Sequence, residues 1–246
     1  MTVRPSRQSL WLILLFSIVL APANASALAA DGEHIFVSGG PALREWENLR
    51  KSADQHDKYW HNFVRKAKWR MVEVLKKEGP NVQLTWLVYK PAYQKRASEE
   101  GRPLVQWVES VVRYFKDQHN KHVKLVWFNS GDDLIRYINS GQNRRKNKIA
   151  MFEYFGHSNR HAFLFDYSCD IMGASKAWLH ENDLSKIKRR SFAKNAFCRS
   201  FGCHTGESMS GVWRKHTGVR MWGVQGKTDY AEERVVTVSP GGFWRY

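Results

Sequence analysis

Short apolar runs alternate with amphipathic stretches along most of this chain, and the alternation restricts the fold more than any other feature. Apolar runs predict buried strands at residues 82–89, 123–128, 148–155, 195–203 and 219–224. Apolar residues recur at helical spacing in residues 60–79, 102–118, 130–141 and 207–216. Strands that alternate with helices form mainly parallel sheets covered on both faces. We therefore predict an α/β fold with three layers and a mainly parallel central sheet.

Residues 1–29 have the features of a secretory signal peptide. Arg4 and Arg7 precede an apolar run from Leu10 to Ala21, which is too short to span a bilayer comfortably. Small residues follow this run, at the spacing that a signal peptidase accepts. We expect the protein to be exported to the periplasm or the extracellular space, with no transmembrane span after cleavage. The alternative is an uncleaved anchor.

The rest of the chain divides into two segments. Residues 30–79 predict an N-terminal lead-in, flexible from Asp31 to Gly40, followed by an amphipathic helix that ends at Gly79-Pro80. Residues 80–246 carry the other predicted strands and helices and form the expected α/β domain. A short strand at residues 162–168 and one or two helical turns at residues 181–190 complete the predicted elements.

The chain is strongly basic, with a formal net charge of +16 that becomes +14 once Arg4 and Arg7 are removed. This excess favours anionic partners such as surface polymers, and it does not indicate a specific nucleic acid. Two basic clusters, at residues 144–148 and 186–190, lie between predicted elements. Solvated loops are the simpler interpretation of both clusters.

Reactive side chains follow two of the predicted strands. The strand at residues 148–155 is followed by Gly156-His157, and the strand at residues 195–203 ends with Gly202-Cys203. Ligands of open α/β sheets bind outside the carboxyl ends of the strands. If these strands are parallel neighbours, His157 and Cys203 meet at one edge. An imidazole beside a thiol can remove its proton, and a helix beginning near Glu207 would favour the thiolate.

At these two strand ends the sequence resembles a known family. "YFGHS" and "SFGCHTG" are similar to the His and Cys motifs of the caspase-like (clan CD) cysteine peptidases, which include caspases, metacaspases, legumain-like and gingipain-like enzymes. The order also matches, with the histidine first, and "CHTG" is close to the Cys-His-Ser-Gly of metacaspases. The resemblance covers residues 82–224 by topology, although its motifs comprise only about a dozen residues.

The resemblance implies a caspase-like fold and peptidase activity on peptide or protein substrates, with no cofactor and no metal. It implies His157 as general base and acid and Cys203 as nucleophile. It also implies an oxyanion hole formed by the backbone N–H of Cys203 and one near Gly156 or Ser158. Two departures stand out, because Ser158 replaces the usual glycine and Phe201 replaces an acidic residue that metacaspases use to select basic side chains.

Other residues around these motifs allow simpler interpretations. Asp166, Asp170 and His204 could line a substrate pocket, but solvated loop positions are the simpler interpretation for the two acids. Of the three cysteines, Cys198 lies within a predicted strand and is expected to pack in the core. At most one disulfide can form among Cys169, Cys198 and Cys203.

Two alternatives to a peptidase remain open. A zinc site could use His157, His161, Cys203 and His204, although no glutamate follows in the usual metalloprotease pattern. A non-catalytic caspase-like or other α/β module could instead bind an anionic surface polymer or protein through its positive charge. Binding of that kind would weaken steeply as salt is added.

Overall fold

The structure is a computed structural model that describes residues 32–49, 51, 59–166 and 175–246. The predicted signal peptide lies outside the described residues, as do Cys169 and Asp170. Among the helices of the described ranges, none is both long and apolar enough to cross a bilayer.

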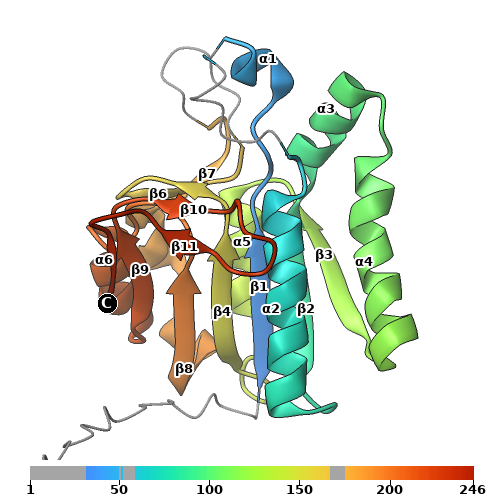
Figure 1. Cartoon of the computed structure of the whole chain (residues 1–246). Helices are drawn as coiled ribbons and strands as arrows, with labels where there is room; N and C mark the ends of the chain where they lie inside the picture. The colour runs from blue at the N-terminus through green and yellow to red at the C-terminus, as the bar shows by residue number, and fades with distance from the viewer. Residues whose placement is uncertain (1–31, 50, 52–58, 167–174) are drawn as a thin grey trace, which may run out of the picture.

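A seven-stranded sheet forms the centre of the molecule, in the order β12-β9-β8-β4-β1-β2-β3 (Figure 1). All neighbouring strands are parallel except β12, which runs antiparallel to β9 at one edge. The strands are β1 (Glu33–Ser38), β2 (Gln83–Tyr89), β3 (Val123–Phe128), β4 (Ile149–Phe155), β8 (Phe192–Ser200), β9 (Met221–Gln225) and β12 (Phe243–Arg245). The predicted α/β class with a mainly parallel central sheet is confirmed.

Helices cover both faces of the sheet and create two apolar cores. One core contains side chains of α2 (Asn62–Glu78) and α4 (Leu104–His119), and we call the face they cover the α2 face. The other core contains side chains of α5 (Gly131–Ser140) and α6 (Met209–Thr217). Figure 1 shows α2 in front of the sheet and α5 behind it. The three-layer arrangement follows from the apolar stripe along each helix.

The prediction of a flexible lead-in from Asp31 to Gly40 is wrong. Residues 33–38 form β1, which is buried along its whole length and pairs with β2 on one side and β4 on the other. His34 and Glu33 interrupt the apolar run, so the segment lacks the composition of a fully buried strand. The helix α2 packs against both β1 and β4, which places residues before Gly79 in the same body as those after it.

Several helices differ from the sequence prediction. The helix α3 (Lys90–Glu100) was not expected, because its polar sequence has no continuous apolar stripe. The predicted helix at residues 207–216 begins at Met209 instead. Two 3₁₀ segments, η2 (Glu181–Lys186) and η3 (Arg189–Ser191), replace the expected helical turns at residues 181–190, and α1 (Arg44–Glu47) is a single turn.

Two small sheets lie beyond the carboxyl ends of the central strands. The first is antiparallel and consists of β5 (His157–Ser158), β6 (Ala162–Leu164) and β7 (Trp178–His180). The second pairs β10 (Thr228–Asp229) with β11 (Thr237–Val238). The two sheets are formed by the segments that follow β4 and β9, so both lie near the predicted site.

Candidate functional site

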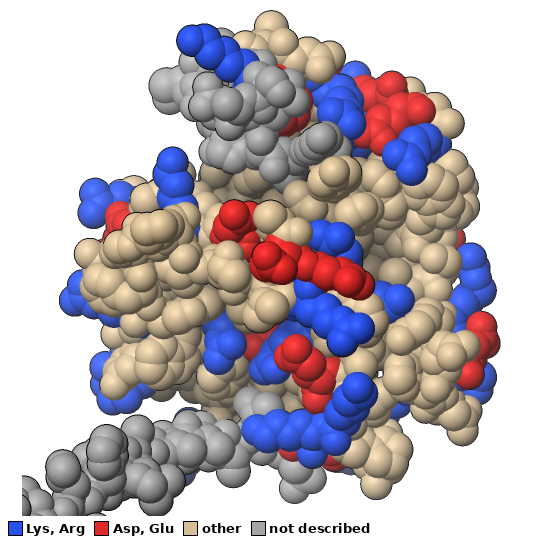
Figure 2. All heavy atoms as spheres, in the orientation of Figure 1, with Lys and Arg blue, Asp and Glu red and all other residues tan. Residues whose placement is uncertain are grey.

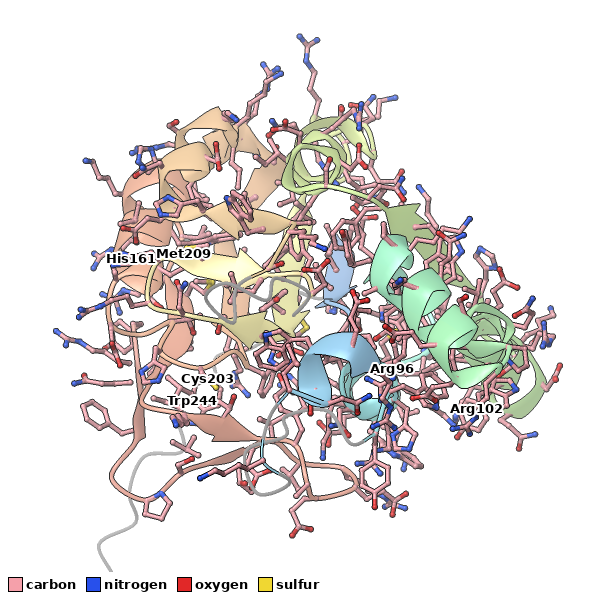
Figure 3. All side chains as sticks on the ribbon, turned by 90° about the horizontal axis from the view of Figure 1, so that it is seen from above. Arg96, Arg102, His161, Cys203, Met209 and Trp244 are labelled. Atoms are coloured by element: carbon pink, nitrogen blue, oxygen red, sulfur yellow. The ribbon has the colours of Figure 1, made fainter. Side chains whose placement is uncertain are left out.

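The two predicted catalytic residues follow neighbouring strands in matching register. β4 and β8 are parallel, and Tyr154 lies opposite Ser200, so paired residues differ by 46 positions. His157 and Cys203 are separated by the same 46 positions. Both therefore emerge at the carboxyl edge of the sheet, each directly after a glycine that follows its strand; β8 ends at Ser200, three residues before Cys203 and earlier than the predicted strand. Figure 3 looks from above onto this end of the sheet and labels Cys203 there.

His157 lies on the α2 face. Met151 and Phe155 of β4 pack in the core on this face, and so does Phe201 after β8. Residues 157 and 203 lie beyond these strands, in β5 and in a turn, so the side of His157 is given by its own contact. The His157 ring contacts Phe63 of α2 edge-on, with ring centroids 5.0 Å apart.

The Cys203 thiol is half-buried and free of any disulfide. Its Sγ accepts a hydrogen bond from the Thr228 backbone N–H at 3.3 Å, and lies 3.4 Å from the Thr228 hydroxyl oxygen. Cys198 is also free but completely buried, and burial raises its thiol pKa well above the usual value. The expected packing role of Cys198 is therefore confirmed, and solvent reaches only the Cys203 thiol of this pair.

Close packing joins the two strand ends. The Ser158 hydroxyl donates a hydrogen bond to the Cys203 carbonyl at 2.6 Å. A Cβ at Gly202 would lie 2.1 Å from the Ser158 hydroxyl oxygen, and one at Gly156 would lie 2.6 Å from the ring carbon that bears the Tyr154 hydroxyl. The two glycines are thus needed for close approach, and they hold the histidine and cysteine segments against each other.

One backbone N–H of β5, that of Ser158, does not point toward the partner strand β6. Asn159 N–H donates to the Ala162 carbonyl, which places the preceding pair, Ser158 and Phe163, at a non-hydrogen-bonded position of the hairpin. The Ser158 N–H is therefore directed away from β6. Gly156 differs, because its N–H donates to the Tyr230 hydroxyl at 3.3 Å. Of the two amides predicted near His157, Ser158 has the more suitable orientation for an oxyanion.

The prediction that a helix beginning near Glu207 would act on Cys203 is not supported. Residues 203–208 form successive turns, and α6 begins only at Met209. The influence of a helix dipole falls off within about the first turn of the helix. The nearest donor to the sulfur is instead the N–H of Thr228.

His204 is held beside Cys203 by its own ion pair. Its backbone is left-handed, with φ of 62°, and its Nδ1 lies 2.6 Å from a Glu207 carboxylate oxygen. The same oxygen accepts a hydrogen bond from Gly226 N–H, and Arg160 lies 3.6 Å from the other oxygen. The bond to His204 is the largest of these effects and lowers the Glu207 pKa. His204 therefore lies next to Cys203, and its role in a substrate pocket stays a prediction.

Asp166 does not occupy the solvated position that its sequence context suggested. It is buried, and its carboxylate accepts hydrogen bonds from the Ser175 hydroxyl at 2.7 Å and the Lys176 N–H at 2.8 Å. Buried acids are normally paired in this way. Asp166 thus connects to Ser175 and Lys176, and its carboxylate already accepts two hydrogen bonds.

The residues that the zinc alternative required do not form a metal site. Among the described residues, no group of three or more histidine, cysteine or acidic side chains has a metal-binding arrangement. His161 points its Nδ1 at Glu181, 2.9 Å away, at the far end of the hairpin from Cys203. The i, i+4 spacing of His157 and His161 brings two histidines together only on a helix, and here the segment is a hairpin.

Four residues at the site were not identified from the sequence. Phe63 and Thr228 contact His157 and Cys203 directly. The Tyr230 hydroxyl donates to the Phe201 carbonyl, and the Tyr154 hydroxyl donates to the His157 carbonyl at 2.7 Å. Burial raises the Tyr154 pKa, which keeps the phenol protonated and able to donate. Thr228 and Tyr230 follow β9, so the rule about strand ends would have found them had it been applied to that strand.

Comparison of the chain with models of protein families, with curated proteins and with solved structures finds no match. Any functional assignment therefore depends on the chemistry and the geometry of the strand ends. The most specific feature is that His157 and Cys203 follow two neighbouring parallel strands in matching register.

Proposed function

We propose that this protein is a cysteine endopeptidase with a caspase-like arrangement of its catalytic pair. Cys203 is the nucleophile and His157 is the general base and acid. The observation that carries the proposal is their placement after neighbouring parallel strands in matching register. The disulfide-free state of Cys203 adds to it, because the nucleophile must be a free thiol.

The proposed reaction has two stages. His157 takes the thiol proton as Sγ forms a bond to the scissile carbonyl carbon, and the carbonyl oxygen becomes an oxyanion. The N–H groups of Ser158 and Cys203 are the donors that would stabilise it. The carbon–nitrogen bond then breaks, and the imidazolium gives its proton to the leaving amine. Water hydrolyses the remaining thioester, with His157 again as base, and regenerates the free thiol.

The side chains around the pair suit this role. Phe63 fixes one edge of the imidazole, and Tyr154 fixes the backbone carbonyl of His157. Ser158 ties its own segment to Cys203. A pair of reacting groups held by packing and hydrogen bonds loses less entropy when it reacts, which raises the rate.

Substrate selection is expected to differ from that of metacaspases with basic specificity. Phe201 lies at the position that is acidic in those enzymes, and its ring stacks on Phe155 with centroids 4.6 Å apart. It is nearly buried in the core on the α2 face and presents no charge. The chain's own acids near the thiol, such as Glu207, are already paired with His204.

The proposal is tested with a mixture of peptides of varied sequence. The intact protein should cleave a subset of them, and both Cys203→Ala and His157→Ala should abolish the cleavage while circular dichroism remains unchanged. His161→Ala is the matched control, because it removes an exposed histidine from the same hairpin and should retain activity. Undiminished cleavage by folded Cys203→Ala would rule out the proposed nucleophile. Absence of cleavage by every form, with salt-sensitive binding to polyanions, would favour the non-catalytic module.

A further inference from the structure

The chain after β9 crosses the site before it returns to the sheet at β12. We call residues 227–238 the strap; it contains β10 and β11 and the connection between them. Figure 1 shows this segment passing in front of the sheet and beside α2. Residues 230–236 connect the two strands, and residues 231–235 among them are all exposed.

The strap contacts the proposed nucleophile and the strand end beside the histidine. Three polar groups of Thr228 lie close to the Cys203 sulfur. Its backbone nitrogen is 3.3 Å from Sγ, its hydroxyl oxygen 3.4 Å and its carbonyl oxygen 3.9 Å. Tyr230 bridges the two strand ends, because its hydroxyl accepts from Gly156 N–H and donates to the Phe201 carbonyl. One short segment therefore contacts both the thiol and a backbone donor beside the histidine.

Side chains of α2 hold the strap in this position. Lys66 is almost fully buried, and its ammonium donates to the Val235 carbonyl at 2.7 Å. Arg65 donates to the Tyr230 carbonyl at 3.5 Å. The Arg234 guanidinium lies over the Trp69 ring, 4.5 Å from its centroid. Burying an ammonium is costly unless it is hydrogen-bonded, so the Lys66 contact ties the strap to the helix.

Phe63 connects the strap to the histidine as well. Its ring contacts Tyr230 edge-on at 4.9 Å and His157 at 5.0 Å between centroids. Movement of Tyr230 would therefore change the packing around both members of the pair. Figure 2 shows acidic side chains near the centre of the face seen in Figure 1, and the strap carries the exposed acids Asp229, Glu232 and Glu233.

We propose that the strap is an autoinhibitory element and that the structure represents the closed state of the protein. The inference rests on the proposed function, because it concerns access to the same thiol. A carbonyl carbon must approach Sγ to bond distance with its oxygen directed at backbone donors. In the closed state Thr228 takes the space beside the sulfur, and Tyr230 fastens the strap to both strand ends. Release of the strap from Lys66 opens the site to substrate.

The test measures how fast iodoacetamide labels Cys203 at a single pH, with mass spectrometry to separate this thiol from the other cysteines. Two strap-releasing variants are compared with the intact protein: Lys66→Met, and the double variant Thr228→Ala with Tyr230→Phe. Lys77→Met is the matched control, because Lys77 is an exposed lysine of α2 whose ion pair is with its neighbour Glu78. Cys198 reports on folding and should stay unlabelled in all forms, since it is fully buried.

Both strap variants should label at least about tenfold faster than the intact protein, the scale expected when one or two hydrogen bonds to the closed state are lost. Labelling that is unchanged or slower in both, with Cys198 protected, would overturn autoinhibition and make the strap a support for the thiol. If peptide cleavage is absent throughout while labelling still rises, the proposed function fails and the strap's control of the thiol stands. If the intact protein cleaves peptides but the strap variants neither label nor cleave faster, only the strap inference fails.

Discussion

The key polar groups at the two ends of the central sheet differ in their burial and in the length of their hydrogen bonds. At the amino ends of the strands, the fully buried Glu33 accepts hydrogen bonds from Thr85, Tyr137 and Arg144 at 2.5–2.7 Å. Arg144 in turn donates to the Ile138 and Tyr137 carbonyls. This network is closed to solvent and both of its charges are partnered, which is the arrangement that buried charges require for stability.

At the carboxyl ends, the groups of interest are only partly buried and their contacts are longer. The Cys203 sulfur lies 3.3–3.9 Å from the atoms of Thr228, and His157 is half-buried against Phe63. The contrast separates structural polar groups from candidate reactive ones. A saturated, buried network stabilises the fold, whereas partly buried groups with longer contacts can exchange those contacts for contacts with a substrate.

The largest expected effect is on activity at the carboxyl end. Cys203→Ser and His157→Ala should each abolish peptide cleavage while changing the free energy of unfolding by less than about 1 kcal/mol, because both residues are only partly buried and neither belongs to the apolar cores. Assays of cleavage and chemical denaturation on the same samples check both parts. The double variant should lose no more cleavage activity than either single variant, since the two residues act as a unit. A large loss of stability in these variants would mean that His157 and Cys203 also stabilise the fold, as the Glu33 network does at the amino ends of the strands.

The next largest effect is on stability at the amino end. Arg144→Ala leaves the Glu33 carboxylate buried without its cation, and we expect a loss of about 3–5 kcal/mol in the free energy of unfolding. The neighbouring Arg145→Ala is the matched control and should cost less than about 0.5 kcal/mol, because Arg145 is exposed. Urea denaturation distinguishes the two. Equal stability of the two variants would mean that the Glu33 network does not stabilise the fold.

A smaller effect concerns the buried lysine beside the strap. Burial, and then the charge of Arg65, lower the Lys66 pKa from 10.5 to about 8. Between these values the unfolded chain binds the proton and the folded chain does not, so stability should rise with pH. The difference in unfolding free energy between the intact protein and Lys66→Met should change by about 2 kcal/mol from pH 7 to pH 9.5 in favour of the intact protein. A constant difference across this range would mean that Lys66 titrates normally.

The smallest effect is expected at Glu207. Its hydrogen bond with His204 lowers its pKa below 4.5, so its contribution to stability is present above about pH 4.5 and is lost as the pH falls through the folded-state value. Glu207→Gln should therefore lower stability by less than about 1 kcal/mol at pH 6, and the difference should shrink at pH 3.5. Denaturation at the two pH values is the measurement. A difference that grows in acid would contradict the assigned pKa direction.

Much of the fold was predictable because most strands are continuous apolar runs. The strands near residues 82–89, 123–128, 148–155 and 219–224 all appear, within one or two residues of the predicted bounds. β1 was missed because Glu33 and His34 are charged or polar, and their burial depends on partners far along the chain. Arg144 was expected in a solvated loop for the same reason, since Glu33 is 111 positions away.

The site was predictable only where strand ends could be located. His157 and Cys203 follow from the ends of β4 and β8, but their register required the pairing of two strands distant in sequence. Phe63 approaches from α2 and carries no local signal, whereas Thr228 and Tyr230 follow the strand β9 and share the position after a strand end. Asp166 was placed in solvent because its partners, Ser175 and Lys176, lie across a segment whose path the sequence does not show.

The central claim is that His157 and Cys203 act on each other. The most direct measurement is the rate of iodoacetamide labelling at Cys203, at one pH near neutrality, in the intact protein and in His157→Ala, with His161→Ala as control. We expect the intact protein and the control to label at the same rate and His157→Ala to label more slowly, because the imidazole no longer removes the thiol proton. Equal labelling rates for all three forms would contradict the account.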